Sequence, residues 1–402
     1  MTHDRPAAPR VLTAAERFSG PRSRAWDVTD RAAKLAAAGA DIIQLGIGDP
    51  DFDTPAAIFE AAVAALQAGR THYSPFAGEP ALRQAIARRA SEQHGVEVSP
   101  DQVVVFPGAQ CALFAIMLCL AEAGDDIILL EPAYTTYDAV AQSGGGRGVR
   151  VPLAADNGFQ PDVRRVEAAI TEKTRAILMN TPGNPSGTVF DAAALQGLVE
   201  LCRRHGIWLV SDEVYWSLVY EGRHVSPLAL SGGAEVSFVV NSLSKSHAMT
   251  GWRLGWTIAP RDLAHHLGDL AQGLLFGVTQ FVQDAAVAAL TQDLAEVEAM
   301  REIFRQRRDA LCAGLAAIPG LEIHQPSGGM FLLVDIGDLG CDGEVFANAL
   351  LDEAGVAVVP GFAFGDSLRH CVRIGFLRDV EVLEEAVRRI AAFVASRATA
   401  KG

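Results

Sequence analysis

The sequence predicts an α/β protein: a mostly parallel sheet covered by helices on both faces, with a smaller α+β module in the last third of the chain. Two observations predict this fold class. Short apolar runs rich in β-branched residues alternate with longer segments of helical periodicity, which is typical of parallel βα units. The predicted strands are apolar throughout, as expected where both faces of a sheet are covered. With 402 residues, half of them hydrophobic, the chain is long enough for two domains.

The first two thirds of the chain carry the strands of the predicted sheet. A strand at residues 103–106 runs into a helix that begins near Ala109. Another helix is expected at about residues 191–205, with Asp191 as its N-cap. The glycine-rich segment 143–148 is expected to form a turn, because it fits no phosphate-binding motif. Further strands are expected at residues 126–130, 176–180, 207–211, 238–241 and 254–258.

The last third predicts the smaller module. One long amphipathic helix is expected at residues 281–317, a second at 343–354 and a third from Val380, with strands at 330–335, 356–359 and 371–376. We expect residues 1–47 to pack with this module, residues 48–285 to form the large domain, and residues 286–402 to form the small domain.

Composition excludes several classes of function. The excess of 48 acidic over 34 basic residues gives a net charge of −14, which argues against a nucleic-acid surface. The longest apolar run, residues 111–121, is about half of what a membrane-spanning helix needs. The N-terminus has no secretory-signal pattern, and the six scattered cysteines and ten histidines show no metal-binding spacing. We therefore expect a cytoplasmic protein that binds neither nucleic acid nor a membrane and holds no metal.

Lys245 is one of only four lysines in the chain, and it lies in the segment SLSKSHAMTGWRLGW. A lysine amine can condense with a carbonyl cofactor, and nearby hydroxyls and an arginine, here Ser242, Ser244 and Arg253, can hold a phosphate. An isolated SxxK is more often a surface lysine after a strand. The polar residues elsewhere in the chain therefore decide between the two interpretations.

Polar residues follow several of the predicted strands at their carboxyl ends, where open α/β sheets bind ligands. The motif SDEVY places Asp212 and Tyr215 after one strand, and NPSG places Asn184 after another. The motif PGAQ places Gly108, Ala109 and Gln110 at a helix N-terminus, which attracts phosphate. Each motif alone has a structural explanation, as a turn, a helix cap or a strand–helix joint. Their joint occurrence on strand ends predicts one ligand site.

The combination resembles fold type I pyridoxal 5′-phosphate (PLP) enzymes of the class I/II aminotransferase family. The likeness extends from LGIGDPDFDTP through HYSPFAG, PGAQCALF, EPAYTTY, NPSG, SDEVY and the lysine segment to VRIGF. It implies a seven-stranded, mostly parallel sheet in the large domain and transfer of an amino group between an L-amino acid and a 2-oxoacid. It also implies a homodimer whose active sites are shared between subunits.

The resemblance implies specific roles for the polar residues. Lys245 would bind the cofactor covalently and move a proton, and Asp212 would pair with the pyridine nitrogen. Tyr215 and Asn184 would hydrogen-bond the 3′-oxygen, and Tyr134 would stack on the ring. The residues implied at the phosphate are Gly108, Ala109, Gln110, Ser242, Ser244 and Arg253, with Tyr73 from the neighbouring subunit.

On the same resemblance, Arg373 would hold the substrate carboxylate, beside the backbone of Gly48. The family often has an asparagine where Gly183 stands here. Many members also have a serine- and threonine-rich loop, contributed by the partner subunit, where this chain has LLFGVTQF, so Phe276 is predicted to line the pocket instead. The second arginine that aspartate-specific members use for a side-chain carboxylate cannot be placed in this sequence.

Motifs outside the catalytic set resemble those of bacterial arginine–pyruvate aminotransferases. These are AWD, THY, GAQCAL, SLSKSHAMTGWR, QDAA and GGMF. A guanidinium substrate needs an acidic or aromatic partner, and Trp26 and Asp27 are candidates. Asp27 could equally cap a helix that starts near Val28.

Three alternatives to an arginine aminotransferase stay open in the sequence. One is an aminotransferase of broader, aromatic or aspartate-type specificity. Another is a PLP-dependent lyase or oxidase on the same scaffold, because the catalytic residues would be nearly identical. The third is a PLP-binding regulatory domain of a transcription factor, but the residues ahead of the domain are too few for a DNA-binding segment.

Overall fold

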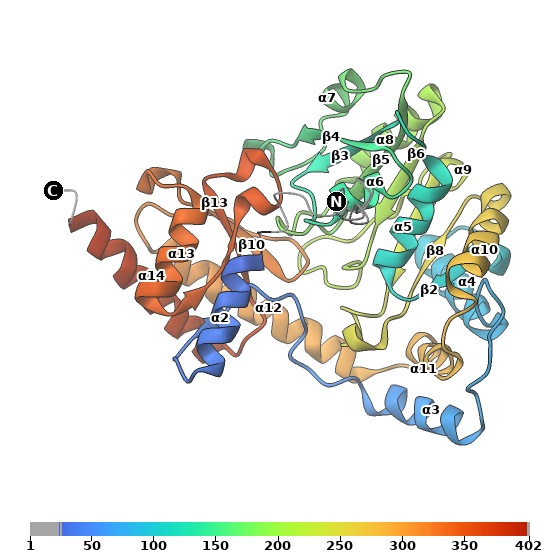
Figure 1. Cartoon of the computed structure of the whole chain (residues 1–402), viewed down its shortest axis with the longest axis horizontal. Helices are drawn as coiled ribbons and strands as arrows, with labels where there is room; N and C mark the ends of the chain where they lie inside the picture. Colours follow the sequence, from blue (N-terminus) through green and yellow to red (C-terminus); the bar gives the residue numbers. More distant parts are fainter. Residues whose placement is uncertain (1–23, 25, 400–402) are drawn as a thin grey trace, which may run out of the picture.

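The large sheet has seven strands, and helices cover both of its faces (Figure 1). The computed structural model describes residue 24 and residues 26–399. The strand order is β2 (Val103–Phe106), β8 (Gly255–Ile258), β7 (Ser237–Ser242), β6 (Trp208–Asp212), β5 (Thr174–Asn180), β3 (Asp126–Glu131) and β4 (Arg147–Pro152). Strands β7, β6, β5, β3 and β4 are parallel to one another, whereas β8 runs antiparallel to both of its neighbours, β2 and β7. The sheet is therefore mostly parallel, as the sequence predicts.

Alternate side chains of one strand show how the sheet is covered. Val103 and Val105 of β2 belong to one buried apolar cluster, and Val104 and Phe106 belong to another on the opposite face. Successive side chains of a strand point to opposite faces. The helices of this body are α3 (Ala56–Gln67), α4 (Pro80–His94), α5 (Ala109–Leu120), α6 (Tyr137–Gln142), α7 (Val163–Ala168), α8 (Ala192–His205), α9 (Gly233–Val236), α10 (Arg261–Leu275) and α11 (Gln280–Thr291).

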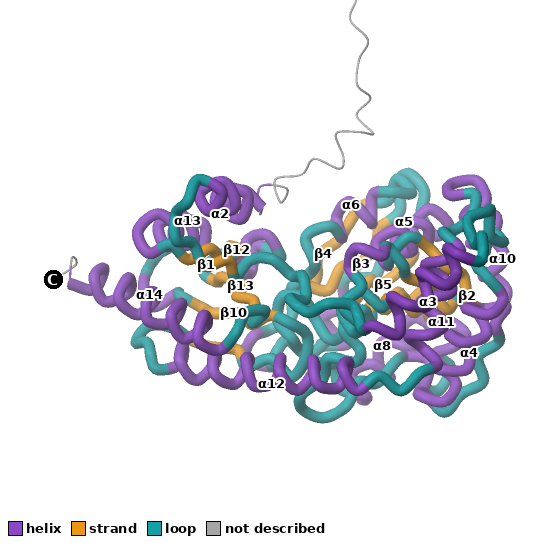
Figure 2. The backbone as a smooth tube through the Cα atoms, turned by 90° about the horizontal axis from the view of Figure 1, so that it is seen from below, coloured by secondary structure: helices purple, strands orange, loops and turns teal. Residues whose placement is uncertain are grey.

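A second, smaller sheet lies in the C-terminal part of the chain (Figure 2). Its order is β12 (Val359–Pro360), β13 (Cys371–Gly375), β10 (Phe331–Asp335) and β9 (Glu322–His324), all antiparallel. Its helices are α12 (Ala295–Ala316), α13 (Gly343–Ala354) and α14 (Val380–Thr399). The N-terminal α2 (Asp27–Ala37) contacts α13, and β1 (Ile43–Gln44) pairs in parallel with β11 (Val356–Ala357). The domain boundaries themselves stay a prediction.

The structure corrects several predicted elements. The helix expected at 281–317 is two helices, α11 and α12, because Gln292 is extended and the two parts bury their apolar faces against different partners, α3 and α14. The strand expected at 356–359 is divided between two sheets. The segment expected to be a turn at 143–148 already enters β4 at Arg147. Asp191 precedes α8, but its side chain makes no capping hydrogen bond.

The described residues contain neither a membrane-spanning helix nor a metal-binding cluster. No helix among them is long and apolar enough to cross a membrane. Nor do their histidine, cysteine, aspartate and glutamate side chains form a group of three or more that could hold a metal ion.

Candidate active site

Three neighbouring parallel strands deliver polar residues to one edge of the large sheet. Asn180 at the end of β5 lies in register with Asp212 at the end of β6, and β7 ends beside them at Ser242. A cavity of about 260 Å³ lies at this edge. Thirteen residues predicted for the site line it: Trp26, Gly48, Ala109, Gln110, Tyr134, Asn184, Asp212, Tyr215, Ser242, Ser244, Lys245, Arg253 and Arg373. We call it the catalytic cavity.

The carboxyl group of Asp212 is buried in the floor of the catalytic cavity. Burial raises its pKa to about 6, although hydrogen bonds from the Tyr137 hydroxyl (2.7 Å) and the Val214 N–H (3.2 Å) oppose the rise. No described cation forms an ion pair with it. A buried carboxylate is costly unless a positive group meets it. Asp212 is therefore suited to a ligand that brings a cationic nitrogen.

Lys245 faces the same cavity from the loop after β7. Its Nζ donates a hydrogen bond to the carbonyl oxygen of Gly48 at 2.5 Å. Burial lowers the pKa of the amine to about 8, with Asp49 opposing the shift and Arg253 and Arg373 adding to it. A lowered pKa leaves more of the amine neutral near pH 7, and the neutral amine is the nucleophile.

A phosphate-sized recess lies where α5 begins. Gly108 precedes the helix with φ of +90°, and a Cβ there would lie 2.5 Å from Arg253 Nη2, so only glycine fits this approach. Ser242 Oγ donates to Ser244 Oγ at 2.7 Å and accepts from the Ser244 N–H at 2.8 Å. Free N–H groups at a helix start, two hydroxyls and a guanidinium together favour a dianion.

Arg373, from β13 of the small sheet, also lines the catalytic cavity. Its side chain is buried, with 1% of its surface exposed. Its guanidinium lies 3.9 Å from the ring centre of Phe331 and donates to Asn184 Oδ1 at 2.9 Å and to the Gly46 carbonyl. Its Nε has no hydrogen-bond partner, and no described carboxylate pairs with it. Burial lowers its pKa to about 10. Such an arginine is suited to an anionic ligand.

Four predicted site residues lie outside the cavity lining. Gly108 acts through its approach to Arg253, as described above. Asp27 does not line the cavity of the described chain: it is exposed in the first turn of α2, whereas Trp26 faces the cavity with its ring centre 5.8 Å from the Arg373 guanidinium carbon. Asp27 does not cap the helix either, since Trp26 holds the N-cap position.

Phe276 does not line the cavity of its own chain, and its role in a loop contributed by the partner subunit stays a prediction. It is 51% exposed and packs edge-to-face on Tyr73, with the ring centres 4.9 Å apart. Tyr73 is 79% exposed and does not reach the cavity of its own chain. The two aromatic rings thus lie together on the surface.

Six lining residues were missed by the sequence reasoning: Leu113, Tyr137, Asn180, Val214, Thr250 and Phe331. Tyr137 matters most, because it holds Asp212. Its position in EPAYTTY, three residues after Tyr134, was a signal that could have found it. Asn180, the last residue of β5, could have been found by the strand-end argument that found Asp212.

The family is shown by comparison with known proteins. A family model described as aminotransferase class I and II matches residues 40–390. The chain belongs to this family. It is 48% identical over 376 residues to the arginine–pyruvate transaminase of Pseudomonas aeruginosa, covering 94% of this chain and 96% of that protein. It is 38% identical to a probable aspartate/prephenate aminotransferase of Aquifex aeolicus, covering 90% and 93%.

The fold agrees with solved structures of the family. The aspartate aminotransferase of Thermus thermophilus with maleate aligns with a TM-score of 0.91 at 36% identity, covering 96% of this chain and 99% of that one. The chain is thus a fold type I, PLP-dependent aminotransferase, whose substrates are an amino acid and a 2-oxoacid.

The residues of the catalytic cavity fit PLP at three separate points. Asp212 offers a buried negative charge for the pyridine nitrogen, the start of α5 with Arg253 suits the phosphate, and Lys245 has a free amine for the aldehyde. When bound, PLP supplies an electron-poor ring that accepts the electron pair left when a bond to the substrate Cα breaks. The protein supplies the binding, the orientation and the proton transfer.

Proposed function

We propose that this aminotransferase takes its amino group from arginine and delivers it to a 2-oxoacid such as pyruvate, by a ping-pong reaction. The observation that carries the proposal is the set of cationic side chains in the catalytic cavity. Its lining holds two arginines: Arg253, beside the phosphate recess, and Arg373, suited to the α-carboxylate. A dicarboxylic donor would need another cation for its second carboxylate, and the described lining offers none for it.

The relatives support the same proposal. The relative that is 48% identical is named for arginine and pyruvate, whereas the relatives named for aspartate or prephenate share 34–39% of their residues with this chain. The indole of Trp26 lies at the cavity and offers an aromatic face to a guanidinium group.

We assign roles to the lining residues on the same grounds. Lys245 holds the cofactor and carries the proton that leaves the substrate Cα. Asp212, held by Tyr137, keeps the cofactor nitrogen protonated, and Asn184 and Tyr215, whose side chains are 3.3 Å apart, hold the cofactor 3′-oxygen. Tyr134 stacks on the cofactor ring. Arg373 fixes the substrate carboxylate, with Gly48 leaving room for it.

We further propose that the enzyme is a homodimer of the cytoplasm with shared active sites. The exposed aromatic surface formed by Tyr73, Phe276 and Phe76 supports the dimer, because exposed apolar patches mark interfaces. In the dimer, Tyr73 would reach the partner's phosphate recess. The six cysteines are all free thiols, which suits a reducing compartment.

The test of the donor is a screen of amino acids on purified, PLP-loaded enzyme without an acceptor. Loss of the absorbance of the lysine-bound cofactor, with appearance of the pyridoxamine form, reports the first half of the reaction. Selective conversion by arginine, reversed by pyruvate, is expected. Conversion mainly by aspartate, aromatic or aliphatic donors would overturn the arginine assignment while leaving the aminotransferase in place. The absence of conversion by every donor would favour a lyase or an oxidase.

A further inference from the structure

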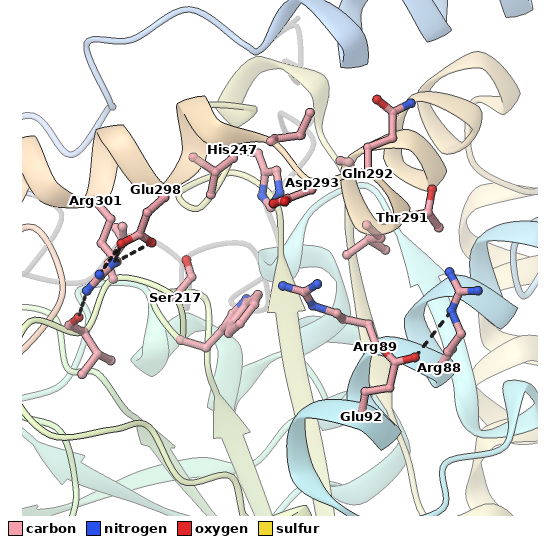
Figure 3. Close-up of a pocket in the computed structure, with 17 residues that line it drawn as sticks. Arg88, Arg89, Glu92, Ser217, His247, Thr291, Gln292, Asp293, Glu298 and Arg301 are labelled. Atoms are coloured by element: carbon pink, nitrogen blue, oxygen red, sulfur yellow. Dashed lines mark hydrogen bonds and ion pairs between the residues drawn. The ribbon is translucent and has the colours of Figure 1, made fainter.

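A second cavity, of about 640 Å³, lies apart from the catalytic cavity and shares no lining residue with it (Figure 3). Its walls come from α4, from the segment 216–219 after β6, and from the C-terminal end of α11 with the first turns of α12. His247, two residues beyond Lys245, closes one side. We call it the second cavity.

Charged side chains of both signs line the second cavity in equal numbers: Arg88, Arg89, Arg301, Glu92, Asp293 and Glu298. Four of them form two ion pairs. Arg88 Nε lies 4.0 Å from Glu92 Oε1, and the Arg301 guanidinium forms a multiple hydrogen-bonded ion pair with Glu298. Figure 3 marks both pairs with dashed lines, together with the hydrogen bond from Arg301 to the Val219 carbonyl.

One cation and one anion remain after this pairing. Arg89 and Asp293 have no ion-pair partner among the described residues, and no hydrogen bond joins them to each other. The Arg89 guanidinium carbon lies 5.8 Å from the ring centre of Trp216, which holds one of its faces. Figure 3 shows both side chains directed toward the middle of the cavity from opposite walls.

We propose that the second cavity binds a free amino acid in its zwitterionic form. The α-carboxylate would accept hydrogen bonds from the Arg89 guanidinium, whose planar fork matches a carboxylate. The α-ammonium would donate to the Asp293 carboxylate. The volume is sufficient for an amino acid with its side chain, and the side chain would lie toward the apolar wall formed by Val219, Leu294 and Val297.

The position of the second cavity gives this binding a structural consequence. Arg89 belongs to α4, which packs on α11, whereas Asp293 lies in the break between α11 and α12. Helix α12 packs on α14, another helix of the C-terminal part that contains the smaller sheet. A ligand held by both charges would therefore join the helices of the large sheet to the helix that leads to the small sheet.

The test uses enzyme loaded with pyridoxamine 5′-phosphate and no 2-oxoacid, so that an added amino acid binds without turnover. L-alanine, the probe, is titrated calorimetrically; the pyridoxamine form has no aldehyde with which the probe could condense in the catalytic cavity. A binding event at the second cavity is expected. Arg89→Gln and Asp293→Asn should each weaken this event by about tenfold or more, because each removes one charged hydrogen-bond partner.

Arg88→Gln is the matched control, because it makes the same change on the same helix and in the same cavity at an arginine that Glu92 already pairs. It should leave the binding event unchanged. The absence of binding to the unmodified enzyme would overturn the proposal, as would binding that survives both test substitutions or is lost with Arg88→Gln. Loss with Arg89→Gln alone would indicate a simple anion site and overturn the zwitterion. Because no turnover is measured, these outcomes do not depend on which donor the enzyme uses.

Discussion

The two cavities of this chain differ in the burial and the ion pairing of their charged side chains. In the catalytic cavity, Asp212 and Arg373 are buried, Lys245 is enclosed, and none of the three has an ion-pair partner among the described residues. In the second cavity the charged side chains lie near the solvent, and two thirds of them are paired with each other. Burying an unpaired charge is costly, so it persists only where a ligand supplies the missing partner. The contrast thus separates buried charges kept for chemistry from charges that stay near the solvent, most of which pair with each other.

The largest effect is expected at Lys245. Lys245→Ala removes the amine that binds the cofactor and moves the proton, so kcat should fall by roughly 10⁴-fold or more. The measurement is turnover together with the absorbance of the lysine-bound cofactor, and both should disappear while the circular dichroism spectrum is unchanged. A variant that keeps the absorbance band would show that another group carries the cofactor.

Arg373 should give the next largest effect. Arg373→Lys keeps the charge but loses the planar fork, and Arg373→Met loses both, so kcat/KM should fall for donor and acceptor alike and more steeply for Met. Truncating one partner of a buried charged contact costs about 2–5 kcal/mol, or about 30-fold to several thousandfold.

Arg373→Met also tests how much the buried guanidinium group destabilises the folded protein. Without substrate, Arg373 is a buried cation with no anionic partner, so Arg373→Met should leave the free energy of unfolding unchanged or raise it. Chemical denaturation of the substrate-free enzyme measures this. A strong loss of stability with Met would mean that Arg373 is a structural residue.

Protonation of Asp212 makes the stability of the cofactor-free protein depend on pH. Its folded-state pKa of about 6 lies above the usual 3.8, so the folded protein binds this proton more tightly than the unfolded chain. Its contribution therefore destabilises the cofactor-free protein increasingly as pH rises from about 4 to 6 and is constant above that, at about 3 kcal/mol at most. Cofactor removal followed by denaturation at several pH values measures the slope.

Asp212→Asn is the control for this slope. The difference in stability between the variant and the unmodified protein should grow with pH over that window and then level off. The variant should also release PLP more readily, because the cofactor nitrogen loses its counter-charge. A difference that does not depend on pH would show that Asp212 is not protonated near pH 6.

The pattern of apolar and polar residues along the chain predicted many of the helices and strands. The bounds of the others were determined by contacts with elements that are distant in the sequence. The strand at 103–106 and the helix at 343–354 have the predicted bounds, because each is a single apolar or amphipathic run with clear ends. The segment 281–317 reads as one amphipathic helix, yet it breaks before α12 because its two parts pack on different bodies. Periodicity carries no information on which body a helix will contact.

The residues of the catalytic cavity also fall into some that the sequence could place and others whose position depends on packing. Asp212 and Ser242 could be placed together because both end parallel strands, and strand ends share an edge. Trp26 and Asp27 could not be distinguished, since adjacent residues at a helix start point about 100° apart and only packing decides which faces the ligand. Phe276 stays a prediction for a related reason: its ring meets Tyr73 on the surface of one chain, and a second copy would have to complete the wall.

The smallest effect is expected at Arg301, one of the paired charges of the second cavity. Arg301→Gln removes the ion pair with Glu298, whose side chain is 68% exposed, and a hydrogen bond to the Val219 carbonyl. Exposed ion pairs contribute about 0–1 kcal/mol, so the free energy of unfolding should fall by less than about 1 kcal/mol, and less still at high salt. Denaturation at low and high ionic strength measures this, with Glu298→Gln as the matched partner variant. A loss of several kcal/mol would mean that this ion pair is as sensitive as the charges of the catalytic cavity, and exposure would then not account for the contrast between the two cavities.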